Sequence, residues 1–354
     1  MNTINMLSSA EKVKGQGVMS AYLEQVSLVR EGLHDDYDIF VNKVGFCDIM
    51  HYHTIDFQHF LFLPLAKLKG TAVGYVHFLP ETVDGSLNLP TIAKKVFYWY
   101  IIKFYKSMDL LVTVNPLFVD KLVGYGIPRE KIFYIPNFVS DSDFYPLEGT
   151  RKLRHKEEFG YKPDDFVVLG VGQLQTRKGV EDFIKIARAM PEMQFVWAGG
   201  FSFGAFSDGY AELKKQVENP PKNLKFTGIV EREVMNDLYN MADVMFLPSY
   251  SELFPMTILE AMNCELPLLL RDLPEYKEIL SSWYLKGNNN QEFIAALSEL
   301  RTNQDFYQAS QDKSREGKAF YSKDSVLKMW EQFYARALGI KKGGRRKVYE
   351  KRLD

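Results

Sequence analysis

Residues 249–272 read SYSELFPMTILEAMNCELPLLLRD, and this stretch decides which fold the sequence predicts. The apolar run that precedes it, ending at Leu247, predicts a buried strand. Pro255 prevents a helix from starting earlier, and residues 257–262 then have the composition of a helix. We therefore expect Glu252 on a loop at the carboxyl end of a strand, and Glu260 about one turn inside the following helix.

This placement predicts a ligand site. In open α/β sheets, ligands bind in the crevice at the carboxyl ends of the strands. The backbone amides of Phe254, Met256 and Thr257 are expected at the helix N-terminus, where an anionic phosphate is favoured. The carboxylates of Glu252 and Glu260 could then accept hydrogen bonds from sugar hydroxyls. The alternative is an ordinary strand–loop–helix unit with two solvated glutamates.

Length and composition indicate a globular protein of two domains. A chain of 354 residues is too long for one ordinary core, and its hydrophobic fraction of 46% is normal. The net charge of −1 gives no overall attraction for nucleic acid, so we expect no such partner. Cys47 and Cys264 are far apart and form neither a disulfide framework nor a metal pattern, which favours a reduced, cytoplasmic setting.

No segment has the pattern of a membrane-crossing helix. Residues 1–15 lack the apolar core of a signal peptide. No run reaches the roughly 18 apolar residues that a transmembrane helix needs. Any membrane contact is therefore expected to be peripheral.

Strands and helices alternate along the chain with mostly short connections, which is the pattern of a doubly wound α/β protein. The expected strands are residues 3–7, 37–42, 48–53, 71–78, 110–114, 132–136, 166–170, 194–198, 224–227, 244–247 and 267–270. The expected helices are residues 18–30, 58–68, 90–106, 116–124, 180–190, 231–241 and 257–262, and residues 291–338 are expected to be wholly helical. The polar stretch 138–163 is the expected domain boundary.

The opening stretch resembles the E-x7-E signature of family 4 of the retaining glycosyltransferases. The matching residues are Pro248, Ser249, Glu252, Phe254, Glu260, Ala261, Met262 and Pro267. Pro255 and Glu265 stand where the family commonly has glycine, and the second departure puts the local turn in question. The resemblance implies the GT-B fold, in which two Rossmann-like doubly wound domains face a central cleft. The domains would be residues 1–145 and 146–323, with a last helix, 324–354, crossing back onto the first domain.

A second candidate loop, residues 170–179, reads GVGQLQTRKG. Gly172 would let the backbone approach a ligand closely, and Arg177 and Lys178 could neutralise a departing diphosphate. The alternative is a solvated basic turn. The loop resembles the family's G-R-L-x-x-x-K-G segment, in which Lys178 matches the lysine and Gln173 replaces the arginine.

The first half contributes further candidates through the same resemblance. Gly17, in Gly15-Gln-Gly17, is similar to the family's glycine turn under the donor phosphate. His77 ends a predicted strand, where the family has a histidine that points at the donor hexose. His51 and His53 are interpreted as mainly structural.

We predict chemistry without a metal ion or other cofactor. No D-x-D motif lies on a strand-end loop, and Asp141-Ser-Asp143 falls in a segment where the family has polar turn residues. Cations and helix amides would replace the metal. The nucleotide-sugar donor that the resemblance implies, a UDP-sugar, would be a substrate and not a cofactor.

Residues 90–106, PTIAKKVFYWYIIKFYK, combine lysines with interfacial aromatic side chains. This composition suits a helix that lies on an anionic lipid surface, and we favour that reading over a buried helix capped by lysines. The lysines are Lys94, Lys95, Lys103 and Lys106. Residues 58–69 add a second apolar stretch with two lysines. The basic end of the chain, residues 341–354, is either another anchor or a solvated tail.

Four segments carry a narrower resemblance: GQLQTRKGVEDFIKIA (172–187), FVWAGG (195–200), NPPKNLKFTGIVERE (219–233) and FLPSYSELFPMTILEA (246–261). Together they resemble the Gram-positive enzymes of this family that add a second sugar to glucosyl-diacylglycerol, which makes the anchor of lipoteichoic acid. This implies a UDP-hexose donor, a glycolipid acceptor and a position on the inner face of the cell membrane. The most similar branch uses UDP-galactose, and a close branch uses UDP-glucose. Glu252 would fix the sugar, Lys178 the diphosphate and Glu260 the ribose, with transfer that retains the anomeric configuration. A polysaccharide acceptor, a GT-B sugar-nucleotide epimerase and an inactive partner subunit are the alternatives.

Overall fold

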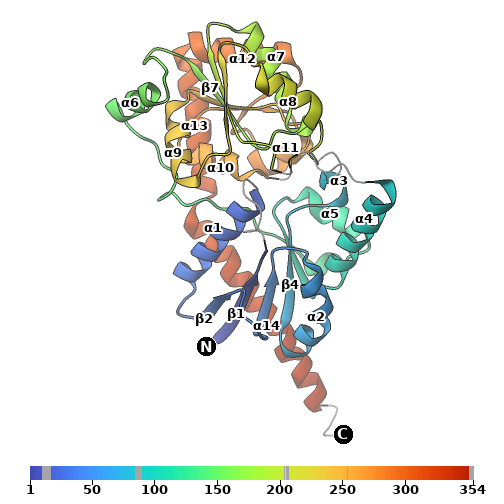
Figure 1. Ribbon diagram of the computed structural model, residues 1–354. Coiled ribbons are helices and arrows are strands. Elements are labelled where there is room, and N and C mark those ends of the chain that lie inside the picture. The colour runs from blue at the N-terminus through green and yellow to red at the C-terminus, as the bar shows by residue number, and fades with distance from the viewer. Residues whose placement is uncertain (10–16, 84–89, 203, 205–206, 253, 351–354) are drawn as a thin grey trace.

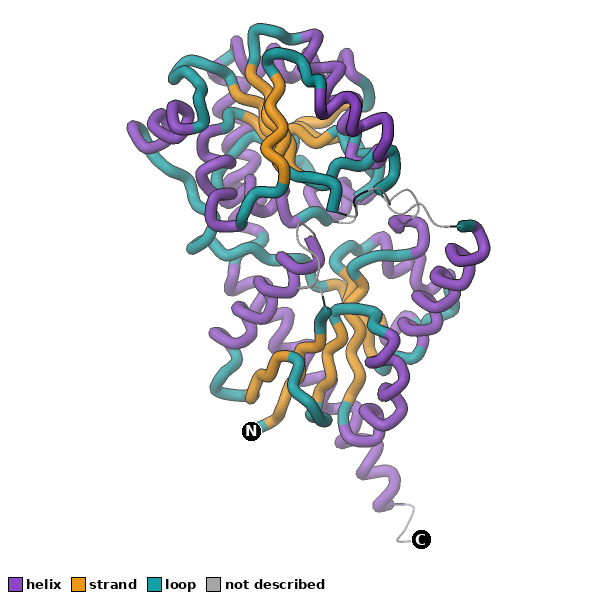
Figure 2. Tube along the Cα trace, in the orientation of Figure 1, coloured by secondary structure: helices purple, strands orange, loops and turns teal. Residues whose placement is uncertain are grey.

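The computed structural model describes residues 1–9, 17–83, 90–202, 204, 207–252 and 254–350 of the chain. Two six-stranded sheets form the centres of two domains, which lie one above the other in Figure 1. Neighbouring strands pair in parallel in both domains. Figure 2 shows the strands of each sheet side by side, with helices around them. The predicted doubly wound α/β class is therefore confirmed.

The first sheet has the strand order β2-β1-β3-β4-β5-β6. Its strands are β1 (Asn2–Leu7), β2 (Tyr37–Val41), β3 (Ile49–Tyr52), β4 (Thr71–Val76), β5 (Leu110–Thr113) and β6 (Ile132–Tyr134). Its helices are α1 (Gly17–Gly32), α2 (Phe57–Lys69), α3 (Pro80–Val83), α4 (Thr91–Lys106) and α5 (Leu117–Gly124). Apolar side chains of α2, α4 and α5 pack in one core cluster with the sheet. Because both faces of the sheet are covered, every residue of β3, β4 and β5 is buried.

The second sheet has the strand order β12-β11-β10-β7-β8-β9. Its strands are β7 (Val167–Val171), β8 (Gln194–Ala198), β9 (Leu224–Gly228), β10 (Val244–Leu247), β11 (Leu268–Arg271) and β12 (Leu285–Gly287). Its helices are α6 (Thr150–Glu158), α7 (Val180–Ala189), α8 (Tyr210–Glu218), α9 (Arg232–Met241), α10 (Met256–Asn263), α11 (Pro274–Leu280), α12 (Asn290–Thr302) and α13 (Gln304–Phe320). Counted from β7, this order is 3-2-1-4-5-6 read from one edge, the Rossmann arrangement.

The strand order fixes where a ligand can bind in the second domain. The chain changes direction across the sheet between β7 and β10, which are neighbours. Loops that leave the carboxyl ends of these two strands diverge and open a crevice. The two candidate loops of the sequence, residues 172–179 and 248–255, are these loops.

The last helix, α14 (Lys323–Glu350), crosses back onto the first domain, as the resemblance implies (Figure 1). The Thr71 hydroxyl donates a hydrogen bond to the Ala337 carbonyl oxygen over 2.8 Å. The Tyr334 hydroxyl lies 3.0 Å from both the Gln25 amide nitrogen and the His51 Nδ1 atom. Trp330 and Tyr334 are almost fully buried, so this helix is part of the first domain's core.

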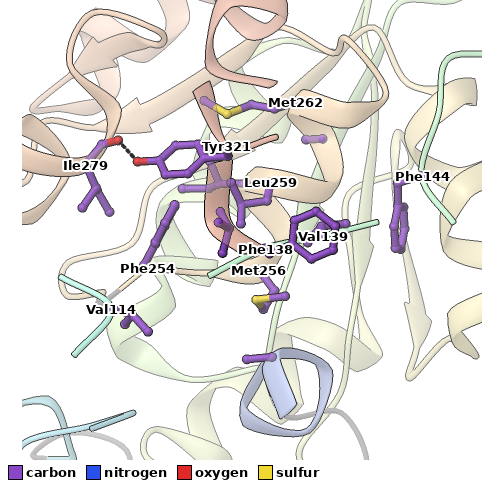
Figure 3. Packing of buried hydrophobic residues seen from close by; sticks show 14 of the residues in the cluster. Val114, Phe138, Val139, Phe144, Phe254, Met256, Leu259, Met262, Ile279 and Tyr321 are labelled. Carbon is purple, nitrogen blue, oxygen red and sulfur yellow. Dashed lines mark hydrogen bonds between the residues drawn. The ribbon is translucent and has the colours of Figure 1, made fainter. Parts of the chain in front are cut away.

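One apolar cluster continues from the first domain into the second. Figure 3 shows Phe138 and Val139, which follow the first sheet, packed beside Met256 and Leu259 of α10. The same view shows Phe254 near Tyr321, whose hydroxyl donates a hydrogen bond to the Ile279 carbonyl oxygen. Phe138 and Val139, at the start of the segment between the sheets, therefore belong to the core that joins the two domains.

The sequence analysis missed several short elements. Helices α6, α8 and α11 and strand β12 were not predicted, and α6 lies inside the stretch interpreted as a polar boundary. Helix α6 has the sequence TRKLRHKEE, so it has almost no apolar stripe from which its period could be read. It is held instead by Lys156, whose ammonium lies 2.8 Å from Asp243. Strand β4 ends at Val76, so His77 follows the strand directly.

Candidate functional site

The loop that carries Glu252 is held by the strand and helix beneath it. The Arg271 guanidinium, at the end of β11, donates to the Pro248 carbonyl oxygen over 2.9 Å and pairs with Asp182 of α7 at 2.8 Å. The Tyr250 hydroxyl donates to the same Asp182 carboxylate over 2.5 Å. Both partners of the Arg271–Asp182 pair are buried, so the loop has a fixed starting direction.

Glu252 and Lys178, which belong to the two strand-end loops, form an ion pair. The Lys178 ammonium lies 2.5 Å from Glu252 Oε1, and Arg177 Nη1 lies 3.7 Å from Glu252 Oε2. Arg177 also donates to the Ser251 carbonyl oxygen over 3.1 Å. The side chains of Glu252 and Lys178 are only 6% and 12% exposed. The structure thus places two cations and one carboxylate of the predicted site in direct contact.

The electrostatics of this cluster favour an ionised Glu252. Burial alone would raise the pKa of Glu252, but the charges of Lys178 and Arg177 outweigh it and hold that pKa below its ordinary value. Burial lowers the pKa of Lys178, and the Glu252 carboxylate opposes that shift. With two cations and one carboxylate, these three side chains together carry a net positive charge.

Two glycines bring the loops together. Gly179 has φ +70°, and a Cβ atom there would lie 2.3 Å from the Pro248 carbonyl oxygen. Only glycine therefore lets Lys178 approach the strand-end loop this closely. Gly172 has φ +152°, and a Cβ atom on it would lie 3.7 Å from the Lys178 side chain. That distance is an ordinary van der Waals contact, and the approach of a ligand to Gly172 stays a prediction.

Helix α10 begins as predicted, with Pro255 at its N-cap. Met256 and Thr257 are its first residues, so their amides lie in the turn that has no intrahelical acceptor. The side chains of Phe254 and Met256 are buried, and the Phe254 carbonyl oxygen accepts a hydrogen bond from Asn137 over 3.0 Å. Their contribution to a phosphate site is thus limited to the backbone.

Glu260 lies in a different set of contacts. The Tyr239 hydroxyl donates to Glu260 Oε2 over 2.6 Å, and Arg232 Nη1 lies 3.5 Å from Glu260 Oε1. Burial raises the pKa of Glu260, and the hydrogen bond from Tyr239 and the charge of Arg232 oppose that shift. The sequence analysis identified Glu260 but neither of its partners.

The turn after α10 accommodates Glu265 at the position where the family commonly has glycine. Glu265 has φ +57°, the left-handed conformation for which the family's glycine is suited. Arg315 lies 2.6 Å from the Glu265 carboxylate and Lys318 lies 3.8 Å from it, and both belong to α13. The glutamate therefore adopts the glycine's conformation, and its side chain adds two ion pairs.

The first domain places three histidines together. His77 packs against Tyr75 and His53, with ring centroids 4.2 and 6.0 Å apart, and His53 packs against His51 at 4.3 Å. Burial lowers the pKa of His77 to about 3, so its ring is neutral near pH 7. Gly17 is the first residue of α1, while the preceding glycine turn lies outside the described residues.

The metal prediction is not decided by the structure. Among the described residues, no group of three or more His, Cys, Asp or Glu side chains is arranged to hold a metal ion. The charges at the crevice are those of Arg177, Lys178 and Glu252. Chemistry without a metal stays a prediction.

Two family models match the chain. The one described as Glycosyl transferases group 1 matches residues 152–317, which include the crevice loops and Glu260. The one described as Glycosyltransferase Family 4 matches residues 46–143, which include the three histidines. Together they match a part of each domain.

Two curated relatives are similar over long stretches. The alpha-galactosylglucosyldiacylglycerol synthase of Streptococcus pneumoniae is 46% identical over 340 residues, which are 96% of this chain and 91% of that protein. The processive diacylglycerol alpha-glucosyltransferase of Acholeplasma laidlawii is 30% identical over 232 residues, which are 62% of this chain and 69% of that protein.

A solved structure has the same architecture. The crystal structure of Anabaena Alr3699/HepE in complex with UDP and glucose superimposes with a TM-score of 0.73 at 14% identity, covering 95% of this chain and 100% of that chain. At this identity the similarity concerns the fold, and it confirms the predicted GT-B arrangement of two Rossmann-like domains.

Proposed function

The chain belongs to glycosyltransferase family 4, and we propose that it moves a hexose from a UDP-sugar to glucosyl-diacylglycerol with retention of the anomeric configuration. The 46% identity to a galactosylglucosyldiacylglycerol synthase over almost the whole chain supports glycolipid glycosyltransfer. Galactose is the proposed sugar because that relative is named for a product in which galactosyl precedes glucosyldiacylglycerol.

The observation that carries the proposal is the cluster of Lys178, Arg177 and Glu252 beside the N-terminus of α10. A nucleotide diphosphate carries negative charge, and the two cations and the helix amides can compensate it without a metal ion. The Glu252 carboxylate, ionised and fixed by the same cations, is the proposed acceptor of hydrogen bonds from hydroxyls of the attached hexose. Glu260 is the proposed acceptor for the ribose hydroxyls.

Retaining transfer can follow from this arrangement. As the bond from the anomeric carbon to the phosphate oxygen breaks, negative charge grows on the diphosphate, where Lys178 and Arg177 stabilise it. The acceptor hydroxyl attacks the anomeric carbon from the face that the phosphate leaves. Its proton passes to the departing phosphate oxygen. His77, neutral and at the carboxyl edge of the first sheet, is the proposed contact of the hexose from the opposite domain.

The first domain has a surface suited to a lipid acceptor. On α4, Ile92, Val96 and Trp99 are 79%, 60% and 65% exposed. The adjacent α2 exposes a further apolar stripe, formed by Phe57, Leu61, Phe62, Leu65 and Leu68. Neither helix contains an acidic residue, and both contain lysines. An apolar stripe flanked by cations is typical of helices that lie on an anionic membrane.

One face of helix α4 is buried in the core and the other is exposed. The two interpretations of residues 90–106, a buried helix and a helix on a lipid surface, therefore each describe one of its faces. Ile101, Phe104 and Tyr105 are buried against the sheet. The outer side contributes to a groove of about 570 Å³ lined by Pro80, Tyr98, Trp99, Ile102, Lys103, Lys106 and Tyr125. Over the described part of the chain, no helix combines the length and apolarity needed to span a bilayer. We propose peripheral contact through the outer sides of α2 and α4.

The test is a transfer assay with purified protein. UDP-galactose and UDP-glucose are each incubated with and without glucosyl-diacylglycerol, and UDP release and glycolipid product are measured. The proposal predicts a diglycosyl-diacylglycerol only with both substrates, and predominantly with UDP-galactose. Transfer from UDP-glucose would favour the second candidate, a glucosyltransferase, which the name of the Acholeplasma relative supports. Interconversion of UDP-sugars without acceptor would contradict both.

A further inference from the structure

A cluster of charged side chains joins the two domains beside the predicted ribose site. Arg232, the first residue of α9, lies between Glu260 of α10 and Glu24 of α1 and forms an ion pair with each of them. Asp143, in the segment between the sheets, lies 3.5 Å from the same guanidinium. The side chains of Glu24 and Glu260 are 4% and 6% exposed, and that of Arg232 is 28% exposed. One guanidinium group therefore interacts with carboxylates from both domains.

The cluster is rigidly built. The Arg232 guanidinium lies over the Phe144 ring, 5.0 Å from its centroid. Phe144 in turn packs against Tyr239, whose hydroxyl binds Glu260. On the other side, the backbone amide of Ser140 donates to Glu24 Oε2 over 3.0 Å. Glu24 is thereby fixed to the segment that connects the domains as well as to Arg232.

The geometry of arginine suits this position. Nη2 faces Glu24 and Nη1 faces Glu260, so the two ends of one planar fork contact carboxylates of different domains. Lysine has a single ammonium and cannot span both in the same way. Without Arg232, Glu260 would keep the Tyr239 hydroxyl as a hydrogen-bond donor but lose the cation beside it. A buried carboxylate without a cation favours its neutral form.

We propose that Arg232 is a positioning residue for the nucleotide: it keeps the Glu260 carboxylate charged and oriented toward the ribose, and through Glu24 it makes that orientation depend on contact with the first domain. The inference rests on the proposed function, since it takes Glu260 as the ribose acceptor. Arg232 itself is not required to touch the nucleotide. Donor affinity would then be coupled to the approach of the two domains.

Binding of UDP, measured by calorimetry on the full chain at pH 8, where the Glu24 carboxyl with its pKa of about 7 is ionised, tests the proposal. We expect Arg232→Met and Glu260→Gln each to raise the Kd of UDP about tenfold, and the double variant to bind no more weakly than Glu260→Gln alone. Such non-additivity identifies residues that act as one unit. With UDP-galactose and acceptor, the KM for the donor should rise in Arg232→Met while kcat changes little. Arg232→Lys should recover only part of the affinity.

A separate set of variants tests the link between Arg232 and the first domain. Glu24→Gln should raise the Kd of UDP severalfold, although Glu24 belongs to the other domain. The matched control is Glu31→Gln, on the same helix, which removes an exposed ion pair with Lys323. This control should leave the Kd unchanged, and circular dichroism should show that all variants are folded.

The outcomes separate the two proposals. If Glu260→Gln leaves the Kd of UDP unchanged, the ribose assignment is wrong and the role of Arg232 is wrong with it. If Glu260→Gln weakens UDP binding but Arg232→Met does not, or if their effects add, the ribose assignment stands and the positioning role is refuted. An unchanged Kd in Glu24→Gln would refute the coupling to the first domain.

Discussion

The cationic outer side of α4 should determine how tightly the protein binds anionic membranes. The change that tests this is Lys95→Glu, Lys103→Glu and Lys106→Glu together, since all three side chains are exposed. Lys94 is left in place because its ammonium lies over the Tyr98 ring, 5.9 Å from the centroid. The apolar stripe of α2 and α4 is unaltered, so any loss of binding reports the charges.

The expected magnitude follows from the number of charges. Each lysine near an anionic leaflet contributes about 1 kcal/mol. Removing three therefore costs about 3 kcal/mol, which is roughly a hundredfold in the partition coefficient, and the new carboxylates add repulsion. Because salt screens exposed charges, the difference between variant and wild type should shrink as the ionic strength rises.

Sedimentation with vesicles that contain phosphatidylglycerol measures the partition directly. The matched control is Lys215→Glu, Lys222→Glu and Lys225→Glu, which changes three exposed lysines of the second domain and the net charge by the same amount. We expect the α4 variant to lose binding and the control to keep it. Transfer to acceptor in bilayers should fall for the α4 variant, while transfer to detergent-dispersed acceptor changes little. Equal binding of both variants would refute the assignment of this face to the membrane.

Four further predictions concern the site and its supports. Glu252→Gln should lower kcat at saturating donor on the order of 100-fold by removing a preorganised charge, with a smaller effect on UDP affinity; a normal kcat in steady-state assays would contradict the sugar-binding role. Activity should survive excess EDTA, and a loss that manganese or magnesium restores would show that a metal is needed. Gly179→Ala should lower the free energy of unfolding by roughly 2 kcal/mol or more, because the new methyl group meets the Pro248 carbonyl oxygen in a left-handed backbone, and urea denaturation would measure this. Burial raises the pKa of Glu24 from 4.5 to about 7. The folded state therefore retains a proton that the unfolded chain releases, so this residue's contribution to stability should decline by up to roughly 3 kcal/mol as pH rises from about 5 to about 7, and thermal melts of Glu24→Gln should lack that decline.

The local pattern of the sequence was enough to predict the alternating α/β class and the strand-end positions of the crevice loops. Buried parallel strands are short apolar runs, and β8 and β10 have the predicted limits. Pro255 and the spacing of Glu252 and Glu260 locate the start of α10, because a helix start is set by residues close in sequence. Short polar helices such as α6 were not predicted, because they lack apolar residues at helical spacing.

The tertiary structure decided which charges meet. Lys178 and Glu252 were each identified from motifs, but their pairing across 74 residues depends on β7 and β10 being neighbours in the sheet. The pair of Glu24 and Arg232 spans 208 residues and two domains, and the sequence analysis identified neither residue as part of a site. The period of apolar residues along a sequence indicates which face of a helix or strand is buried. The partner of a buried charge is fixed only when separate helices and strands pack against each other. Most residues of the site could therefore be predicted from the sequence, whereas the charge interactions among them depend on the tertiary fold.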